Sequence, residues 1–444
     1  MRVLKQIPEV SFLKFLRHSV SILRNPLPFH NSNFLLHGNS FRLKIGFRKS
    51  VIFTRDAELL SYVLQKNQKN YTKSPIQTRD LAKYIGKGLL TAEGEKWQKQ
   101  RKLIQPAFHK SQLALLLDTI HSIIQKELNN IVTDKPSDVF PVFNDLAFQV
   151  VVKSLFSSEI KEDDIKKLQH ATEITQQMLV KELRQPYLGW WFKVSGKIKF
   201  HIDLIDESRA ILRRLVNERK QSASKYNDLL DMLLDARYED GEAMEEAQLL
   251  DEILILFAAG HETTSNALTF TCELLARNPE AQNKILEEVH KVKNESSDIM
   301  HWLKNSNYTK IVIEEAMRLY PPAYFIDRIN KEDDQFNGFE LPRGSNLLFS
   351  VYEIHRHPDF WDKPESFVPE RFLDENIKFS KNYYPFGAGQ RMCIGNNFAM
   401  YEMILAIMTV VEQYEILKKK TPIQIKPLIT LKPFEAILEF KARK

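Results

Sequence analysis

Cysteine is scarce in this sequence, because Cys272 and Cys393 are the only two in 444 residues. Two cysteines cannot form the dense disulfide framework of a small secreted fold, so we expect a protein of a reducing compartment. Long apolar runs are also missing: the most apolar stretch, Ile253–Gly260, is far shorter than the ~20 residues that a membrane-spanning helix needs. No signal peptide is recognisable. We therefore expect a cytoplasmic protein without a membrane-spanning anchor.

Repeats, low-complexity tracts and linkers rich in Pro, Gly and Ser are absent as well. The length alone would allow two or three domains, but without such a linker we expect a single domain over residues 31–444. The charge is nearly balanced, since a net charge of +6 is spread over interspersed residues of both signs. This balance argues against a nucleic-acid-binding protein.

Residues 1–30 are set apart by an amphipathic pattern. Apolar residues recur at helical spacing with basic residues between them, namely Phe12, Leu13, Leu16, Val20 and Leu23, interrupted by Lys14, Arg17 and Arg24. Such a helix either packs on its own domain or lies at a membrane surface. A peripheral membrane contact through this segment is therefore one of two expectations.

The chemistry of the chain concentrates in Tyr384–Gly395. Here Cys393 lies in a turn with three glycines, ahead of an apolar segment that predicts a helix over about Asn397–Leu417. The positive end of a helix dipole favours thiolate over thiol, and glycines let the backbone approach a flat ligand closely. A lone cysteine is more often a small buried apolar residue. A zinc site is excluded because no second ligand is near, and a dinucleotide loop is excluded because Met392 stands where its third glycine belongs.

The pattern F-x-x-G-x-R-x-C-x-G decides between these interpretations, because Phe386, Gly389, Arg391, Cys393 and Gly395 match its five fixed positions. It resembles the haem-binding loop of the cytochrome P450 family, in which a cysteine thiolate holds the haem iron. The resemblance implies that Cys393 is the axial ligand of haem b. It also implies that Arg391 pairs with a haem propionate and that Phe386 and Gly395 contact the cofactor.

A second informative stretch runs over about Leu249–Arg277 and is apolar on most faces, which predicts a buried central helix. His261 and Glu262 begin a zinc-protease pattern, but Ser265 stands where its second histidine is required. The segment A-G-H-E-T-T instead resembles the family motif A-G-x-[DE]-T, which crosses the distal face of the haem. The resemblance implies that Glu262 and Thr263 deliver protons to bound dioxygen. The alternative is a threonine that only hydrogen-bonds to the preceding turn.

Other family motifs follow in the expected order. Positions that the family uses to bind haem propionates are matched by Trp97, Arg101, Arg328 and, in H-R-H-P, His355. The E-x-x-R motif at Glu315 and Arg318, together with Arg371, matches a structural triad that holds the haem-loop side of the family fold together.

The resemblance covers about Phe41–Phe440 and implies a mainly α fold with small β-sheets, the haem-thiolate fold. Alternation and turn residues predict the strands of that fold. The expected pairs are Phe41–Phe47 with Val51–Phe53, a hairpin at Asn337-Gly338 that continues into Asn346–Val351, and a closing hairpin of Ile423–Leu431 with Ala436–Phe440.

Two surface features are expected to meet partners. The aromatic cluster Tyr187–Phe192 is either a core patch or, by the resemblance, part of the roof of the substrate pocket, where it could also touch lipid. Lysines 96, 99 and 102 and the run Lys418–Lys420 are expected to attract an acidic electron donor. The alternative is ordinary solvated lysines.

The function implied is that of a monomeric monooxygenase that activates O2 and hydroxylates a lipophilic substrate. Fatty acids, terpenoids and carotenoids all fit, and we favour fatty acids. No fused flavin reductase is expected after Cys393, so electrons should come from a separate ferredoxin or flavodoxin and its reductase. A peroxide-using or isomerising enzyme on the same fold is one alternative, although such relatives usually lack the acid–threonine pair. The other is a non-catalytic haem or gas sensor, which needs no distal proton relay.

Overall fold

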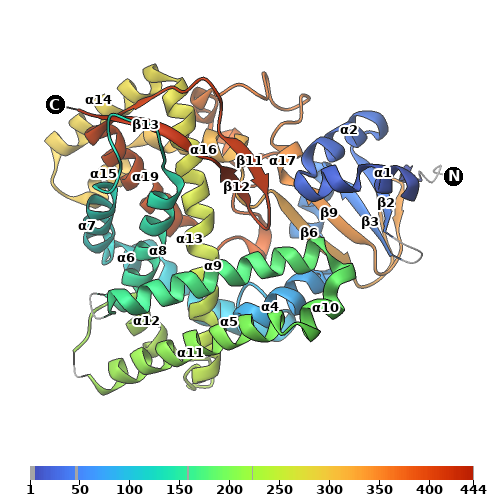
Figure 1. The fold of residues 1–444 in the computed structure, drawn as a ribbon, viewed down its shortest axis with the longest axis horizontal. Coiled ribbons are helices and arrows are strands. Elements are labelled where there is room, and N and C mark those ends of the chain that lie inside the picture. The colour runs from blue at the N-terminus through green and yellow to red at the C-terminus, as the bar shows by residue number, and fades with distance from the viewer. Residues whose placement is uncertain (1–5, 46–48, 158–159, 223, 444) are drawn as a thin grey trace. The chain divides into compact units, whose positions relative to one another are not determined.

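The computed structural model describes residues 6–45, 49–157, 160–222 and 224–443 (Figure 1). The chain divides into two compact units. The first unit comprises residues 1–74, 311–393 and 424–434, and the second comprises residues 75–310, 394–423 and 435–444. Helix α16 (Asn307–Leu319) begins in the second unit and continues into the first.

The first unit contains a six-stranded sheet with the order β1-β2-β3-β9-β6-β4. Its strands are β1 (Glu9–Val10), β2 (Ser40–Ile45), β3 (Lys49–Thr54), β9 (Asn346–Ser350), β6 (Phe325–Asn330) and β4 (Tyr71–Thr72). The predicted pairing of the first two long strands is confirmed, since β2 and β3 are antiparallel with Phe41 opposite Phe53. The part of that expectation that falls on residues 46–48 lies outside the described residues. Phe41 and Phe53 stack in a core cluster with Phe29 and Phe34, so the aromatic residues of the alternating pattern define the buried face of the sheet.

Shorter elements complete the first unit. They are α1 (Phe12–Arg24), α2 (Leu27–His37), α3 (Ala57–Ser61), the π-helix η1 (Tyr62–Lys66), η2 (Gln68–Asn70), β7 (Asp334–Phe336), β8 (Phe339–Leu341), α17 (Val351–Ile354), η6 (Pro369–Leu373), α18 (Glu375–Lys378), η7 (Gly389–Arg391), β11 (Gln424–Pro427) and β12 (Leu431–Phe434). The hairpin predicted at Asn337-Gly338 is confirmed: both residues have positive φ, 48° and 86°, which is the geometry that an Asn-Gly turn supplies.

The second unit is built of helices. Its elements are η3 (Ile76–Leu81), α4 (Ala82–Ile85), α5 (Gly94–Ile104), η4 (Gln105–Phe108), α6 (Lys110–Ala114), α7 (Leu117–Leu128), β5 (Ser137–Asp138), α8 (Phe140–Phe156), α9 (Glu162–Arg184), η5 (Pro186–Leu188), α10 (Gly189–Val194), α11 (Lys197–Gln221), α12 (Leu229–Asp235), α13 (Glu246–Arg277), α14 (Pro279–Glu295), α15 (Ile299–Asn305), α19 (Asn396–Gln413), β10 (Tyr414–Leu417) and β13 (Ile437–Ala442).

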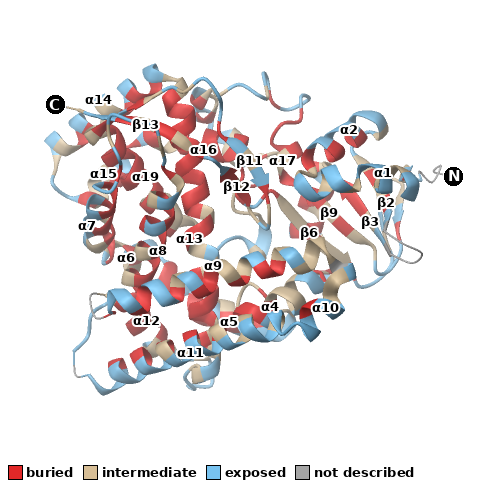
Figure 2. Cartoon of the chain, in the orientation of Figure 1, coloured by how far each residue is buried: buried red, intermediate tan, exposed pale blue. Residues whose placement is uncertain are grey.

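Helix α13 is the buried central helix that the sequence predicts, and it packs along α8 (Figure 1). Gly260 permits this close approach, because a Cβ there would lie 2.9 Å from Cγ2 of Val151 on α8. Figure 2 shows α13 as mostly red, in agreement with the burial of most of its residues. None of the helices in the described part of the chain is both long enough and apolar enough to cross a membrane.

Two expectations near the C-terminus are wrong. The predicted helix over Asn397–Leu417 ends at Gln413, and Tyr414–Leu417 forms β10, which pairs with β13. Tyr and Ile favour the pleated, half-buried surface of a strand, and the pairing with β13 outweighs the continuing apolar pattern. The closing hairpin also differs, because β11 pairs with β12 over Gln424–Phe434, whereas β13 joins β10 and β5. The turn that decides this pairing is Leu428–Thr430, in which the Leu428 N–H donates to the Thr430 carbonyl.

Candidate active site

The cysteine loop of the first unit is a turn that only glycine can complete. Gly387 and Gly389 have φ of +72° and +70°, in the region that L-residues rarely adopt. A Cβ at Gly389 would lie 2.1 Å from the carbonyl oxygen of Leu64 in η1, so the loop rests directly on that helix. The Cys393 N–H donates to the Phe386 carbonyl at 3.0 Å and closes the turn. This backbone leaves the side chain of Cys393 exposed, three residues before the start of α19.

The two cysteines occupy opposite environments. Cys272 is buried in α13, and burial raises the pKa of its thiol well above the ordinary value. The thiolate is the form that binds metals and acts as a nucleophile. Cys393 is therefore the cysteine whose surroundings permit such chemistry.

His355 fixes the start of the cysteine loop. Its ring is fully buried, and Nε2 accepts a hydrogen bond of 2.8 Å from the N–H of Tyr384. Burial, assisted by the nearby charges of Arg318 and Arg356, lowers the pKa of His355 from 6.5 to about 3. The ring is therefore neutral at physiological pH and acts as an acceptor inside the protein. The predicted contact of His355 with a propionate stays a prediction, whereas this positioning role was not foreseen.

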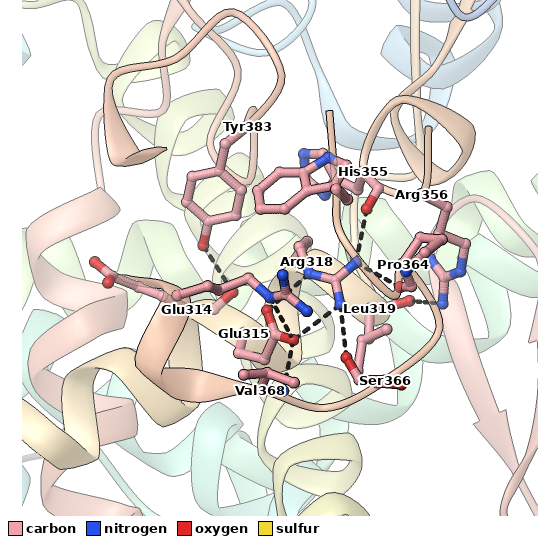
Figure 3. Close-up of polar contacts among 12 residues, drawn as sticks. Glu314, Glu315, Arg318, Leu319, His355, Arg356, Pro364, Ser366, Val368 and Tyr383 are labelled. Atoms are coloured by element: carbon pink, nitrogen blue, oxygen red, sulfur yellow. Dashed lines mark hydrogen bonds and ion pairs between the residues drawn. The ribbon is translucent and has the colours of Figure 1, made fainter. Parts of the chain in front are cut away.

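The residues of the expected triad lie in direct contact in the first unit, and Figure 3 shows Glu315 and Arg318. Glu315 receives two guanidinium N–H groups of Arg318 at 2.7 and 2.8 Å and Nε of Arg371 at 3.1 Å. The backbone N–H of Val368 donates to the same carboxylate at 2.9 Å. Glu315 and Arg318 are fully buried, so each charge depends on the other for compensation.

Arg318 also ties separate loops together. One guanidinium nitrogen donates to the carbonyls of His355 and Pro364, at 2.8 and 2.7 Å, and the other donates to the carbonyl of Ser366 at 3.0 Å. These three carbonyls belong to the segment between α17 and Val368, which precedes the cysteine loop in the sequence (Figure 3). Arg318 therefore positions His355, which in turn positions the cysteine loop.

One face of α13 is open within an otherwise buried helix. Leu256, Ala259, Gly260 and Thr263 are partly or fully exposed, whereas most of their neighbours along the helix are buried. They follow the spacing i, i+3, i+4 and i+7, which places them on a single helix face. The Thr263 hydroxyl donates to the Ala259 carbonyl at 2.8 Å, and Glu262 beside it is buried. Of the two residues predicted to transfer protons, Thr263 lies on this open face and Glu262 is buried next to it in the sequence.

The remaining candidate residues are distributed over both units. In the second unit, Trp97 is buried on α5, and Arg101, one turn later, is half-buried with its Nε on the Gln105 side chain at 3.1 Å. Gly395 caps α19, and a Cβ there would reach only Phe108, at 3.9 Å. In the first unit, Arg328 lies on β6 and donates to the Asp327 carbonyl at 2.7 Å, and Phe386 and Arg391 are half-buried in the cysteine loop.

The residues of the aromatic cluster on α10 divide between the two alternatives expected for it, a core patch and an exposed roof. Trp190 and Trp191 are exposed, but Phe192 is buried in a core cluster with Tyr84 and Met178. Phe192 therefore cannot touch lipid, although the sequence pattern allowed that role for the whole cluster. Phe192 instead packs α10 against the rest of the second unit. Successive residues of a helix point in different directions, so Phe192 can face the core while Trp190 and Trp191 face solvent.

Two carboxylates at the start of α13 hold the loop that leads to α5, an arrangement that the sequence analysis missed. Asp251 accepts the Lys87 N–H at 2.8 Å, and Glu252 accepts the Leu89 N–H at 2.9 Å. Cβ atoms at Gly86 and Gly88 would lie 2.2 and 2.5 Å from these carboxylates, so the glycines are required for contact. The detectable signal is an adjacent acid pair at the entrance of an apolar helix together with a G-K-G segment. We call this arrangement the carboxylate latch.

The position of Glu252 in the carboxylate latch changes the pKa of its carboxyl group. Burial raises its pKa from 4.5 to about 7, although the hydrogen bonds from Leu89 and Gln248 act in the opposite direction. The negative charge of Asp251 raises it further, and Lys96 lowers it. Arg209 on α11 compensates Asp251 at 2.8 Å. The latch therefore contains a carboxyl group that titrates near neutral pH.

The comparisons with known proteins agree on one family. A family model described as "Cytochrome P450" matches residues 7–440. The chain is 28% identical over 407 residues to "Cyclooctat-9-en-7-ol 5-monooxygenase" of Streptomyces melanosporofaciens, covering 90% of this chain and 87% of the relative. It is 30% identical over 396 residues to "Cyclooctatin synthase" of the same species, covering 88% and 85%. It is 28% identical over 406 residues to "Pentalenene oxygenase" of Streptomyces avermitilis, covering 90% and 88%.

A solved structure shares the fold. The crystal structure of the cytochrome P450DA heme domain superposes with a TM-score of 0.89 at 20% identity, covering 100% of this chain and 98% of that one. At this identity the likeness shows the fold alone. The expected mainly α fold with small sheets is thereby confirmed.

Proposed function

Because the chain belongs to the cytochrome P450 family and is thus a haem-dependent monooxygenase, we propose that it hydroxylates a cyclic terpenoid with electrons from separate proteins. The observation that carries the substrate class is the set of Streptomyces relatives, whose names state oxygenation of pentalenene and of cyclooctat-9-en-7-ol. Fatty acids, which the sequence analysis favoured, become the second choice.

Haem fits the residues that are present. The exposed Cys393 offers a thiolate donor on a turn whose glycines admit close backbone approach. On α13, Ala259 and Thr263 are small residues that are not buried, as expected of positions that face a flat cofactor. We propose Cys393 as the axial ligand, with Phe386, Arg391 and Gly395 against the cofactor. When bound, the haem supplies the activation of dioxygen.

Thr263 and Glu262 are proposed to move protons. The Thr263 hydroxyl donates its own proton to the Ala259 carbonyl, so its oxygen lone pairs remain available on the open face of α13. An acceptor in this position can hold a water molecule and relay its proton. Glu262 is the adjacent carboxyl that can exchange protons with that water.

Four cationic or N–H donors are proposed to bind the propionates of the haem: Trp97, Arg101, Arg328 and Arg391. An indole N–H and guanidinium groups suit carboxylates because hydrogen bonds to a charged partner are short and strong. Their tethering to the protein supports the proposal, since Nε of Arg101 is held by Gln105 and a terminal nitrogen of Arg328 by a backbone carbonyl. Side chains fixed in this way lose little freedom on binding a ligand.

A ligand panel tests the substrate class. Cyclic terpenes, linear fatty acids and carotenoids are added to the holoenzyme, and the change of haem spin state is followed by absorbance. We expect the terpenes to bind most tightly. Turnover with a ferredoxin, its reductase and isotopically labelled O2 should then give a product that contains one labelled oxygen atom. Tight binding of fatty acids alone would overturn the substrate class, and oxidation of NAD(P)H without any labelled product would overturn the activity.

A further inference from the structure

Helices α1 and α2 of the first unit expose large apolar side chains to solvent. These are Phe12, Leu13, Leu16, Val20, Leu35 and Leu36. Leu13 and Leu35 are 77% and 73% exposed, so they contribute almost nothing to the core of the protein. We call these side chains the α1/α2 surface; α1 is mainly pale blue in Figure 2, whereas α2 has both exposed and buried residues. Exposed apolar side chains gathered on neighbouring helices are typical of interaction sites.

Helix α1 has two apolar faces, and the fold uses only one of them. Phe15 and Ile22 point to the core cluster of β2, β3 and α2 and attach the helix to the first unit. Leu13, Leu16 and Val20 follow the spacing i, i+3 and i+7, which places them together on another face. Attachment to the core therefore does not account for the second apolar face.

Basic residues flank this second face. Arg17 and Arg24 are exposed, and each follows an exposed apolar residue by four positions, Leu13 and Val20 respectively, so that they lie beside it on the helix. Lys14 donates to Asn33 on α2 at 2.8 Å and joins the two helices. An apolar face bordered by arginines has the arrangement of a helix that lies in the plane of a membrane interface.

The charge of the surrounding sequence has a single sign. Ser11–Arg55 contains eight Lys and Arg residues and no Asp or Glu. The preceding acid, Glu9, already pairs with Lys44 at 2.7 Å. Two copies of this surface would bring arginines against arginines, which disfavours self-association, whereas anionic phosphate groups would be attracted.

We propose that the α1/α2 surface docks the protein on the surface of an anionic lipid bilayer. The leucines and Val20 enter the boundary between headgroups and acyl chains, and Arg17 and Arg24 contact lipid phosphates. Binding through so few side chains is reversible. The proposal does not depend on which substrate the enzyme oxidises.

Vesicle co-sedimentation of the holoenzyme tests the proposal. Vesicles of phosphatidylcholine with phosphatidylglycerol should bind the protein, and vesicles of phosphatidylcholine alone should bind it at least about tenfold more weakly. The variant L16S/V20S/L35S should lower binding to the anionic vesicles by at least about tenfold, because each buried aliphatic side chain contributes strongly. R17E/R24E should act similarly, and added salt should weaken binding of the unchanged protein.

Matched control variants show whether a loss of vesicle binding is specific to the α1/α2 surface or is a general effect of such substitutions. L115S/L373S removes equally exposed leucines elsewhere, and K166E/K167E reverses exposed charges of α9; neither should change binding. All variants should keep the carbon monoxide difference spectrum of the folded holoenzyme. Equal loss in the control variants, or binding that ignores lipid charge, would overturn the proposal. So would a dimer in sedimentation velocity that L16S/V20S/L35S dissociates, because the surface would then be an interface between copies.

Discussion

At the scale of single residues, Cys393 and Cys272 allow the axial ligand to be identified by experiment. Cys393→Ala should abolish the red-shifted Soret band that the reduced holoenzyme shows with carbon monoxide, because no thiolate remains for the iron. Cys272→Ala should keep the band, since this thiol is buried in α13. Absorbance spectra of the reduced proteins provide the measurement. The opposite pattern would falsify the assignment of Cys393.

Thr263 can be tested apart from the other hydroxyls of α13. Thr263→Ala should leave haem and substrate binding nearly unchanged but lower the product formed per NAD(P)H by at least about tenfold, because positioned proton transfer contributes roughly 10²–10⁴-fold. Thr269→Ala is the matched control, because its hydroxyl makes the same bond to the preceding turn but is buried. If both variants form the same amount of product per NAD(P)H, Thr263 has no part in proton transfer.

The sequence predicts individual residues well where a motif fixes both their type and their spacing. Glu315 and Arg318 are of this kind, and the structure places them in contact, whereas the role of Cys393 stays a prediction. The use of His355 as an acceptor for the Tyr384 N–H could not be predicted. The two residues are distant in sequence, and only the fold determines which ring nitrogen is buried against which backbone group.

At the scale of elements, the carboxylate latch links the loop before α5 to α13 and gives a pH-dependent stability. The pKa of Glu252 is about 7 in the fold and near 4.5 when unfolded, so the folded state binds more protons between these values. The contribution of the Glu252 carboxyl group to the stability of the fold is therefore complete below about pH 4.5 and is lost as the pH rises through 7. One pKa unit is about 1.4 kcal/mol, so the loss is about 3 kcal/mol at most.

Glu252→Gln removes this titration but keeps an acceptor for the Leu89 N–H. The melting temperature of the variant relative to the unchanged protein should therefore rise between pH 4.5 and 7 and stay constant above pH 7. Thermal unfolding of the holoenzyme followed by circular dichroism gives the measurement. Glu242→Gln, at an exposed position, is the control and should show a flat difference. If the difference in melting temperature is independent of pH for Glu252→Gln as well, burial does not raise the pKa of Glu252.

Gly88 tests the steric side of the same latch. In Gly88→Ala the new Cβ would lie 2.5 Å from the Glu252 carboxylate, so the loop or the side chain must shift, at a cost of about 1–3 kcal/mol. Gly189→Ala is the matched control, since no atom lies within 4 Å of its Cβ position. Denaturant unfolding should show destabilisation of the first variant only. Equal stabilities would show that the contact is loose.

The helices and strands divide into those that local pattern predicts and those that pairing decides. Helix α13 and the hairpin at Asn337-Gly338 were predictable because apolar periodicity and turn residues are local signals. The end of α19 was not, because Tyr414–Leu417 becomes a strand only through its partner β13, whose residues are distant in sequence.

At the scale of the whole molecule, charge should govern the encounter with the electron donor. Lys96 and Lys99 are exposed on α5, but Lys102 already pairs with Glu239, so the first two are the better candidates. K96E/K99E should slow electron transfer from an acidic ferredoxin by about tenfold at low salt, because exposed opposite charges speed encounter. Stopped-flow rates measured over a range of ionic strength test this. Unchanged rates, or an equal loss in K166E/K167E, would show that α5 is not the docking site.

The fold as a whole was predictable from the order of the family motifs, whereas its division into two units was not. The sequence has no linker to suggest a boundary, and the single domain over residues 31–444 stays a prediction. Segments of the chain return to each unit several times, and such a division depends on contacts between distant residues that no local composition reveals.

This division has a consequence for how the protein is made. The first unit draws on three separate stretches of chain, and its small cluster of Leu27, Tyr324 and Leu431 combines residues from all three. A ribosome synthesises the first of these residues long before the last, so the unit that carries Cys393 stays incomplete until nearly the whole chain has emerged. Domains whose segments are close in sequence can fold during synthesis, but this unit must wait. Nascent chains arrested before Leu431 are therefore expected to retain no haem.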